Sequence, residues 1–233
     1  MTPGEQRRTL LRACAGLGLS SCLTRALPWV ALGLQVAGVG GAGLLGAPQV
    51  HAGAQVEEPL AQSVRSALSA AVADAAPPRP AFDRPEARAA YTLWLGRAGQ
   101  RLQRYKSESH VRIEFLEAVW YESRRAGLET ELVLGLIQVE SGFRKYAISS
   151  AGARGYMQVM PFWSRLIGDG DVSRLFHLQT NLRFGCTILR HYLDIERGDL
   201  FLALGRYNGS RGRAPYPEAV LAARRGWMLG GTS

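Results

Sequence analysis

Cysteine is scarce in this sequence, and its distribution excludes an intramolecular disulfide from most of the chain. Only three cysteines occur in 233 residues. Cys14 and Cys22 lie within the first 52 residues, which leaves Cys186 alone in the remainder, so no pair is left to form a bridge there. Cys186 lies among apolar residues at helical spacing, and we expect a buried small hydrophobe, not a reactive nucleophile.

Histidine is also rare, and its spacing argues against a metal centre. The four histidines show neither the paired spacing nor the cysteine companions of a zinc site; they are His51, His110, His177 and His191. The sequence therefore predicts no structural metal, and nothing in it implies a cofactor.

The first 52 residues are typical of an export segment. Arg7 and Arg8 lie near the start, an uncharged run rich in Leu, Gly, Ala and Val covers 26–47, and small residues follow. This order predicts a signal peptide cleaved after Ala52 or Ala54 and a periplasmic location. We therefore leave residues 1–52 out of the prediction of the fold.

Three other interpretations of this segment stay open. A run of this length is also long enough to remain as a membrane anchor at the N-terminus. The residues around Arg7 and Arg8 resemble a twin-arginine export signal, and those ending at Cys22 resemble a lipoprotein signal. The sequence alone does not choose between the export routes.

The charge of the chain is strongly positive. The formal net charge is +9; the first 52 residues carry four arginines and Glu5, so residues 53–233 keep +6. A basic exported chain attracts anionic polymers, and outside the cytoplasm these are envelope components more often than nucleic acid. A solvated, arginine-rich surface is the plainer interpretation. We expect no nucleic-acid partner, because no nucleic-acid-binding module is recognisable.

Composition changes twice along the remaining chain. Residues 53–90 are rich in Ala, Pro and charge without sustained apolar periodicity, which predicts a disordered linker with at most a short helix near 63–73. From 91 to 229 apolar residues recur at helical spacing almost everywhere, and no segment alternates as a strand would. We therefore expect an all-α, globular, lysozyme-sized domain over 91–229, and a monomer.

Helix boundaries in this domain are marked by characteristic residues. Gly127 is a candidate C-cap for a helix over 115–127, and the apolar stretch 130–141 should form a central buried helix. Candidate N-cap and first-turn residues mark the starts of the later helices: Thr130, Pro161, Thr180 or Asn181, Asp199 and Pro217.

One acidic residue, Glu140, ends the apolar helix LVLGLIQVESGF. Its side chain should lie over Leu136 and Ile137, one turn back. Burial and a position near the helix C-terminus both disfavour the charged form, so we expect a raised pKa and a group suited to general acid catalysis. The alternative is a structural ion pair with Arg144.

Two further stretches resemble parts of a carbohydrate site. AGARGYMQVMPFW, at 151–163, combines flexible glycines with Met157 and Gln158, and ALGRYNGS, at 203–210, ends a helix with Tyr207 and Asn208. Amides pair with N-acetyl and hydroxyl groups, and aromatic faces stack on sugar rings. Each stretch alone is equally compatible with ordinary packing and capping.

Taken together, these residues resemble the lytic transglycosylases of the soluble-lytic-transglycosylase (SLT) type, whose catalytic domain is related to goose-type lysozyme. VESGF is similar to the family's Glu-Ser segment, GYMQVMP to its Gly-Leu-Met-Gln segment, and RYNGS to its Ala-Tyr-Asn segment. Tyr156 replaces the usual leucine and Arg206 the usual alanine. The resemblance covers about 129–227 and implies a lysozyme-like helical domain with a substrate cleft.

The resemblance also implies an activity. It implies cleavage of the bond between N-acetylmuramic acid and N-acetylglucosamine in peptidoglycan without water, which leaves a 1,6-anhydromuramoyl end. Glu140 would be the single general acid and base. Two-carboxylate glycosidases need a second acid, and the nearest candidates, Asp169 and Asp171, are more typical of turn and capping residues.

Roles for the neighbouring residues follow by the same analogy. Ser141 would contact substrate or fix Glu140, Gln158 would bind glycan groups, and Met157 would shape the cleft. The Tyr207 hydroxyl would hold the carboxyl group of Glu140, with Asn208 supporting that wall and Tyr156 adding a stacking surface.

Two rival functions remain alongside the lytic one. A lysozyme-like muramidase would use the same fold with water as the attacking group. A catalytically silent envelope-binding module would need no buried acid.

Overall fold

The computed structural model describes residues 55–73 and 80–228. The predicted export segment, including Ala52, lies outside the described residues, as does the second candidate cleavage point, Ala54. No helix in 55–73 or 80–228 is both long and apolar enough to cross a bilayer.

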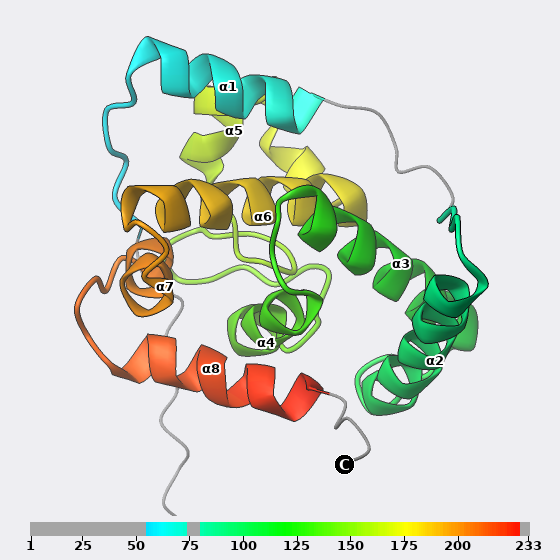
Figure 1. Cartoon of the computed structure of the whole chain (residues 1–233). Coiled ribbons are helices and arrows are strands. Elements are labelled where there is room, and N and C mark those ends of the chain that lie inside the picture. The colour runs from blue at the N-terminus through cyan, green and yellow to red at the C-terminus, as the bar shows by residue number, and fades with distance from the viewer. Residues whose placement is uncertain (1–54, 74–79, 229–233) are drawn as a thin grey trace, which may run out of the picture. The chain divides into compact units, whose positions relative to one another are not determined.

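Helices account for the regular structure of the described chain (Figure 1). They are α1 (Gln62–Ala73), α2 (Pro85–Leu102), α3 (Ser109–Arg125), α4 (Thr130–Ser141), α5 (Pro161–Ile167), the 3₁₀ helix η1 (Val172–Phe176), α6 (Leu178–Ile195), α7 (Leu200–Asn208) and α8 (Pro215–Trp227). In this part of the chain β structure is limited to two isolated bridges, which join Arg154 to Ile148 and to Val159. The predicted all-α class is confirmed.

The structure departs from the expected linker over 53–90. The short helix predicted near 63–73 is present as α1, and it packs against α5 and α6 instead of standing free. Helix α2 begins at Pro85, within the expected linker. Val64, Leu68 and Val72 recur at every fourth position of α1 and face the core, where Leu68 is buried. Disorder is therefore the wrong expectation for 55–73 and 85–90.

Local chemistry explains most helix starts. Proline, which needs no hydrogen-bond partner for its nitrogen, occupies the first turn of α2, α5 and α8. The carboxylate of Asp199 accepts from the backbone N–H of Leu202 and caps α7 as predicted. Thr130, the predicted N-cap, is the first residue of α4, Glu129 is the N-cap, and the hydroxyls of Thr130 and Ser123 share a hydrogen bond.

Helix α4 is the central helix of the domain (Figure 1). It packs against α3 and, most closely, against α8, and six consecutive residues, 132–137, are buried. Gly135 permits this crossing, since a Cβ at that position would lie 2.6 Å from the backbone nitrogen of Arg224 in α8. The two helices that meet here supply two residues of the site described below.

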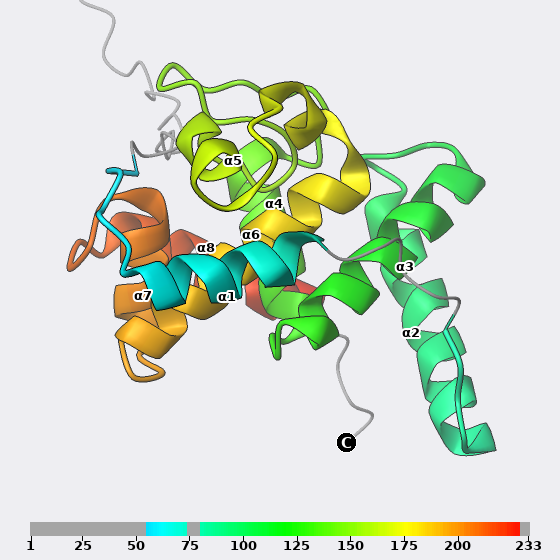
Figure 2. The same ribbon diagram turned by 90° about the horizontal axis from the view of Figure 1, so that it is seen from above.

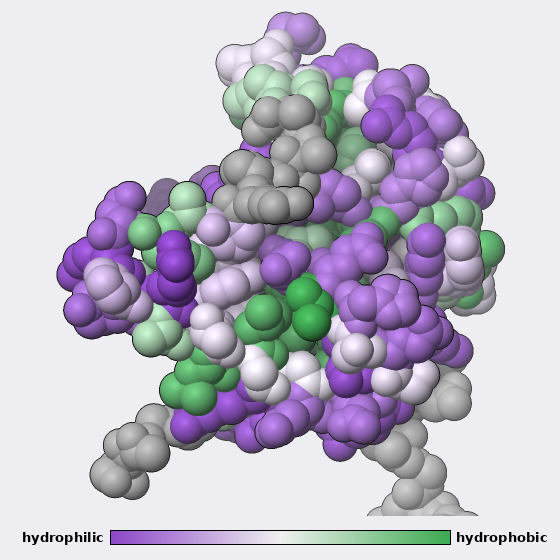
Figure 3. Space-filling view, turned by 90° about the vertical axis from the view of Figure 1, so that its right-hand side faces the viewer, coloured by the Kyte–Doolittle hydropathy of each residue, from purple (hydrophilic) through white to green (hydrophobic). Residues whose placement is uncertain are grey.

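Helices α2 and α3 form one side of the domain. Helix α2 packs against α3 and extends along that side in both ribbon views (Figures 1 and 2). Seen from this side, the surface is mostly hydrophilic with a small apolar area among polar residues (Figure 3). The candidate site lies instead where α4, α6, α7 and α8 converge.

Candidate functional site

Glu140 lies in the last turn of α4, which ends where Gly142 adopts a left-handed conformation. The residues one turn back, Leu136 and Ile137, are fully buried, and the Glu140 side chain is itself partly buried. Loss of hydration disfavours the carboxylate, so burial raises the pKa of Glu140 to about 8. The predicted shift and its main cause agree with the structure.

Tyr216 is the hydrogen-bond partner of Glu140. It lies in the first turn of α8, is 2% exposed, and its hydroxyl donates to Oε1 of Glu140 at 2.5 Å. This bond favours the charged carboxylate and lowers the pKa, opposing the larger effect of burial. Tyr216 could not be predicted from the sequence, because a tyrosine beside two prolines at a helix start carries no signal that it faces a residue 76 positions away.

The alternative partner considered for Glu140, Arg144, is engaged elsewhere. Its Nε donates to the backbone carbonyl of Ser141 at 2.9 Å. This bond satisfies a carbonyl at the C-terminus of α4. The ion-pair alternative is therefore not what the described structure contains.

Residues 155–158 form a turn that lies between α4, α6 and α7 and makes one wall of the candidate site. Gly155 has a φ of 76°, where a Cβ would collide with the carbonyl of Leu175 and the amide of Asn181. Gln158 has a φ of 49°, unusual for a residue with a side chain. Its Nε2 donates to the carbonyls of Gly155, at 2.9 Å, and Ala147, at 3.1 Å. These contacts hold the strained turn in one conformation.

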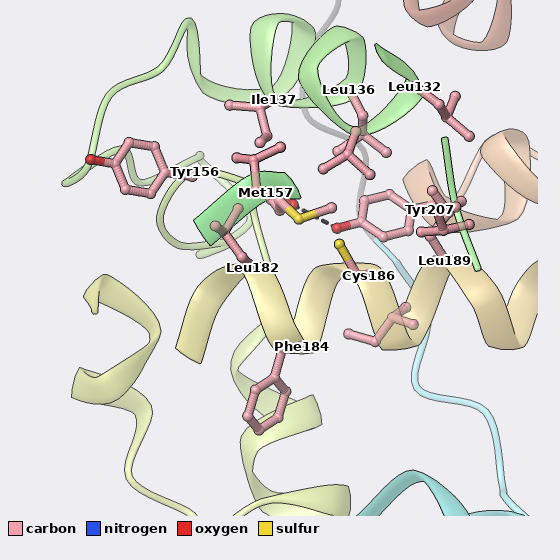
Figure 4. Packing of buried hydrophobic residues seen from close by; sticks show 14 of the residues in the cluster. Leu132, Leu136, Ile137, Tyr156, Met157, Leu182, Phe184, Cys186, Leu189 and Tyr207 are labelled. Atoms are coloured by element: carbon pink, nitrogen blue, oxygen red, sulfur yellow. Dashed lines mark hydrogen bonds between the residues drawn. The ribbon is translucent and has the colours of Figure 1, made fainter. Parts of the chain in front are cut away.

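Three helices hold the same turn through buried side chains. The hydroxyl of Ser141, in α4, donates to the carbonyl of Tyr156 at 2.7 Å. Asn181, in α6, accepts from the N–H of Met157 at 2.8 Å and donates to the carbonyls of Arg154, which precedes the turn, and of Leu175, in η1. The hydroxyl of Tyr207, in α7, donates to the carbonyl of Met157 at 2.7 Å (Figure 4). The turn is thereby fixed relative to Glu140.

Asn181 therefore has a different role from the predicted one. The sequence suggested it, or Thr180, as an N-cap, but α6 begins earlier, at Leu178. Its side chain is fully buried and satisfies three backbone groups outside the helix, which is what a buried amide requires.

The predicted role of Tyr207 is wrong in its partner. Its hydroxyl is bonded to the carbonyl of Met157, and Tyr216 takes the place beside Glu140 that was assigned to it. Tyr207 is still close enough for the charge of Glu140 to raise its pKa, after the larger effect of burial. The motif that contains Tyr207 predicted the correct region. Two buried tyrosines, Tyr207 and Tyr216, lie there, and motif spacing does not show which of them bonds Glu140.

Tyr156 does not offer the expected stacking surface. The residue is 5% exposed, and its ring meets Phe115 edge-on at 4.9 Å. The ammonium of Lys106 lies 4.8 Å from the ring centroid and donates to the hydroxyl at 3.1 Å. Because Phe115 and Lys106 already contact the ring, it is not available to stack on a sugar. Lys106, in the α2–α3 connection, is thus the partner of the tyrosine that replaces the usual leucine.

The other expected substrate-binding residues lie behind the surface. Ser141 and Met157 are almost fully buried, and Gln158 and Asn208 are each 5% exposed. The Nδ2 atom of Asn208 has no hydrogen-bond partner among the described residues. Ser141 and Gln158 hold the 155–158 turn through their hydrogen bonds, and contact of all four residues with substrate stays a prediction.

The acidic residues considered as a second carboxylate have structural roles. Asp171 caps η1 by accepting from the backbone N–H and hydroxyl of Ser173. Asp169 accepts from the N–H of Asp171 and pairs with Arg174. Their interpretation as turn and capping residues is confirmed.

Two predictions about other titratable residues can be compared with the structure. Cys186 is 1% exposed and burial raises the pKa of its thiol strongly, so it is an unreactive core residue as expected. Within 55–73 and 80–228 no cluster of three or more His, Cys, Asp or Glu residues is arranged to hold a metal ion.

Sequence comparison identifies the same region. The family described as Transglycosylase SLT domain matches residues 117–218, which include Glu140, Tyr207 and Tyr216.

Curated relatives share this segment. The chain is 46% identical over 99 residues to the membrane-bound lytic murein transglycosylase C of Actinobacillus pleuropneumoniae serotype 5b, covering 40% of this chain and 24% of that protein. It is 43% identical over 106 residues to the protein of the same name from Glaesserella parasuis serovar 5, covering 42% and 26%. It is 31% identical over 102 residues to the transglycosylase of Enterobacteria phage PRD1, covering 44% and 37%.

A solved structure is also similar. The lytic transglycosylase Slt of Pseudomonas aeruginosa aligns over 60% of this chain and 29% of its own, at 22% identity and a TM-score of 0.44. The chain spans only 24% to 37% of the length of these three curated relatives. Residues 117–218, slightly less than half of this chain, are thus similar to the family described as Transglycosylase SLT domain.

Proposed function

We propose that this chain is a lytic transglycosylase that cleaves the bond between N-acetylmuramic acid and N-acetylglucosamine in peptidoglycan. The observation that carries the proposal is the state of Glu140: a partly buried carboxyl group with a pKa of about 8, held by Tyr216 within an SLT domain. The curated relatives are named lytic murein transglycosylases, which supports the same substrate for this chain.

The proposed reaction uses Glu140 twice. Because its pKa lies near neutrality, the acid is largely protonated before reaction and donates that proton to the leaving glycosidic oxygen as the C1–O bond breaks. The resulting carboxylate, stabilised by the Tyr216 hydroxyl, then takes the proton of the muramoyl C6 hydroxyl. The C6 oxygen bonds to C1 and closes the 1,6-anhydro ring, so Glu140 is reprotonated and no water is consumed.

A single carboxylate is sufficient for this route. Asp169 and Asp171 are engaged in capping and turn contacts, so neither is placed by its bonds to activate a water. The proposal includes Ser141, Gln158, Met157, Tyr207 and Asn208 as the wall of the glycan site, with the hydroxyl of Tyr207 acting on the turn and not on Glu140.

The location proposed for the chain is the cell envelope. The substrate lies outside the cytoplasm, the first 52 residues are typical of an export segment, and the relatives are named membrane-bound. Periplasmic export, with the N-terminal segment cleaved or kept as an anchor, therefore forms part of the proposal, and so does a monomeric state.

The test is digestion of purified sacculi by the wild-type chain and by Glu140→Gln. Wild type should release muropeptides whose masses lack one water relative to hydrolysed products, and Glu140→Gln should release none above background. Glu131→Gln, on the first turn of the same helix, is the matched control and should retain activity. Hydrated products would show a muramidase; binding to sacculi without release would show a silent module. Either result overturns the proposal.

A further inference from the structure

The segment that precedes α1 is built into the domain. Residues 55–60, here called the N-terminal strap, contain Gln55, which is only 7% exposed. Its Oε1 accepts from the indole Nε1 of Trp163, in α5, at 2.8 Å. Its Nε2 donates to the backbone carbonyl of Tyr207, in α7. One amide therefore bonds two residues that are 44 positions apart in the chain and belong to different helices.

A charged contact fixes the other part of the strap. The carboxylate of Glu58 accepts from Nη1 of Arg206 at 2.9 and 3.1 Å. Nε of Arg206 also donates to Glu196, at the C-terminal end of α6, which Arg211 binds in turn. Arg206 stands where the SLT motif has alanine, and the strap gives this departure a physical reason.

The strap connects to the proposed active site through Tyr207. The carbonyl of Tyr207 accepts from Gln55, while its hydroxyl donates to the carbonyl of Met157 in the 155–158 turn. On the other side, Trp163 belongs to the helix that begins directly after that turn. Gln55 thus bonds both the helix that holds the turn and the helix that continues from it.

We propose that the N-terminal strap is part of the catalytic domain and that Gln55 is a positioning residue, fixing α5 against α7 and thereby the wall that faces Glu140. This inference rests on the proposed function. A free tether that only crosses the surface would leave a polar side chain in water, whereas the Gln55 amide is buried with partners on both of its polar atoms.

The effect expected on removal of the amide is catalytic as well as structural. Without Gln55 the α5–α7 spacing is less restricted, the 155–158 turn moves more freely, and water gains access to Glu140. A better hydrated carboxyl group titrates at lower pH, so the alkaline limb of activity should move toward lower pH. If Gln55 served only to stabilise the fold, its removal would not change the pH of the alkaline limb.

The experiment compares full-length variants in sacculus digestion across pH. Gln55→Ala is expected to lower kcat by about tenfold with little change in KM, as misplacement of a catalytic wall does, and to shift the alkaline limb to lower pH. Gln62→Ala, an exposed glutamine seven residues on, is the control and should match wild type. If Gln55→Ala matches Gln62→Ala in both readouts, the inference is wrong.

Two further variants separate the contacts. Gln55→Glu keeps the acceptor for Trp163 but loses the donor to Tyr207, and should behave like Gln55→Ala; wild-type kinetics in this variant would show that shape alone suffices and would overturn the role assigned to the amide. Arg206→Ala restores the residue usual in the motif and releases Glu58. It should shift the alkaline limb in the same direction as Gln55→Ala, by a smaller amount. If the limb does not shift, the Glu58 contact has no part in the strap's function.

Failure of the proposed function and failure of this inference are distinguishable. If wild type releases no muropeptides, the proposed function fails, and hydrogen exchange then reads out the strap. Gln55→Ala should speed exchange of the Met157 amide relative to both wild type and Gln62→Ala. Unchanged exchange at Met157 would overturn the strap's connection to the turn, whatever the enzyme's activity.

Discussion

The hydroxyl of Tyr216 lies 2.5 Å from Oε1 of Glu140; these two residues are 76 positions apart in the chain and belong to helices that cross at Gly135. The contact opposes burial: loss of water raises the pKa of the carboxyl group, and the hydrogen bond lowers it. The outcome, about 8, keeps both protonation states accessible near neutral pH. A group that must first donate and then accept a proton needs that balance.

Tyr216→Phe should therefore shift the pKa of Glu140 upward. The variant removes the bond that favours the carboxylate, so the alkaline limb of the pH–rate profile should move to higher pH. A hydrogen bond to a charged group contributes roughly 1.5–3 kcal/mol, so kcat should fall by about ten- to a hundredfold.

The measurement is kcat on sacculi across pH, with Tyr146→Phe as the matched control. Tyr146 is 70% exposed, and its hydroxyl should not influence Glu140. A Tyr216→Phe profile that moved to lower pH, or that coincided with the control, would contradict the assigned contact.

Glu140→Gln should make the folded chain more stable at alkaline pH. The folded-state pKa of Glu140 lies above its usual 4.5, so the folded chain binds one proton more than the unfolded chain between about pH 4.5 and 8. Stability contributed by the neutral acid is complete below pH 4.5 and is lost as pH rises to 8, by at most about 1.4 kcal/mol per pH unit. Glutamine does not titrate and escapes this loss.

Denaturant unfolding at pH 5 and pH 8.5 tests this expectation. The two proteins should have similar free energies of unfolding at pH 5, with Glu140→Gln the more stable at pH 8.5 by roughly 2 kcal/mol or more. Glu86→Gln, at an exposed position in α2, controls for loss of one charge. An equal difference at both pH values would mean that the carboxyl group is not desolvated.

Tyr207→Phe should distinguish the role of Tyr207 from that of Tyr216. It removes the bond to the carbonyl of Met157 and leaves that buried carbonyl unsatisfied, which costs about 1–3 kcal/mol of stability. Activity should fall because the 155–158 turn loosens, yet the direct hydrogen bond to Glu140 remains. Thermal unfolding and the pH–rate profile together check this. The profile of Tyr207→Phe should not move to higher pH, whereas that of Tyr216→Phe should.

Much of the fold could be predicted from the sequence because its signals are local. The apolar run of α4, Pro161 at the start of α5 and Asp199 at the N-cap of α7 all act within one helical turn. Helix α1 was expected at its correct place for the same reason, but its docking on α5 and α6 was not. Docking depends on residues far apart in the chain, which periodicity does not report.

The same limit explains the errors at the site. Glu140 could be found because its apolar neighbours are one turn away, whereas its partner is on another helix. The motif around Tyr207 predicted the correct side of the site, but it predicted a bond to Glu140 where the bond is to the carbonyl of Met157. Tyr156 and Gln158 were expected to face substrate, but a sequence does not show that Lys106 or the carbonyl of Ala147 already occupies them.

Gly135→Ala should disturb the site from a distance by separating α4 from α8. The added Cβ would lie 2.6 Å from the Arg224 nitrogen, and backbone atoms cannot yield as a flexible side chain can, so the helices must move apart at a cost of about 1–3 kcal/mol. Because Glu140 and Tyr216 belong to these two helices, the movement lengthens their hydrogen bond. The variant should lose stability and lower kcat across the pH–rate profile, because the Tyr216 hydroxyl then stabilises the carboxylate less well. Gly96→Ala is the matched control: that glycine lies in α2 with no atom within 4 Å of the added Cβ, so helix propensity alone should stabilise it by up to about 1 kcal/mol. Should Gly135→Ala instead gain stability like the control and keep the wild-type profile, close contact between α4 and α8 would not be what positions Tyr216.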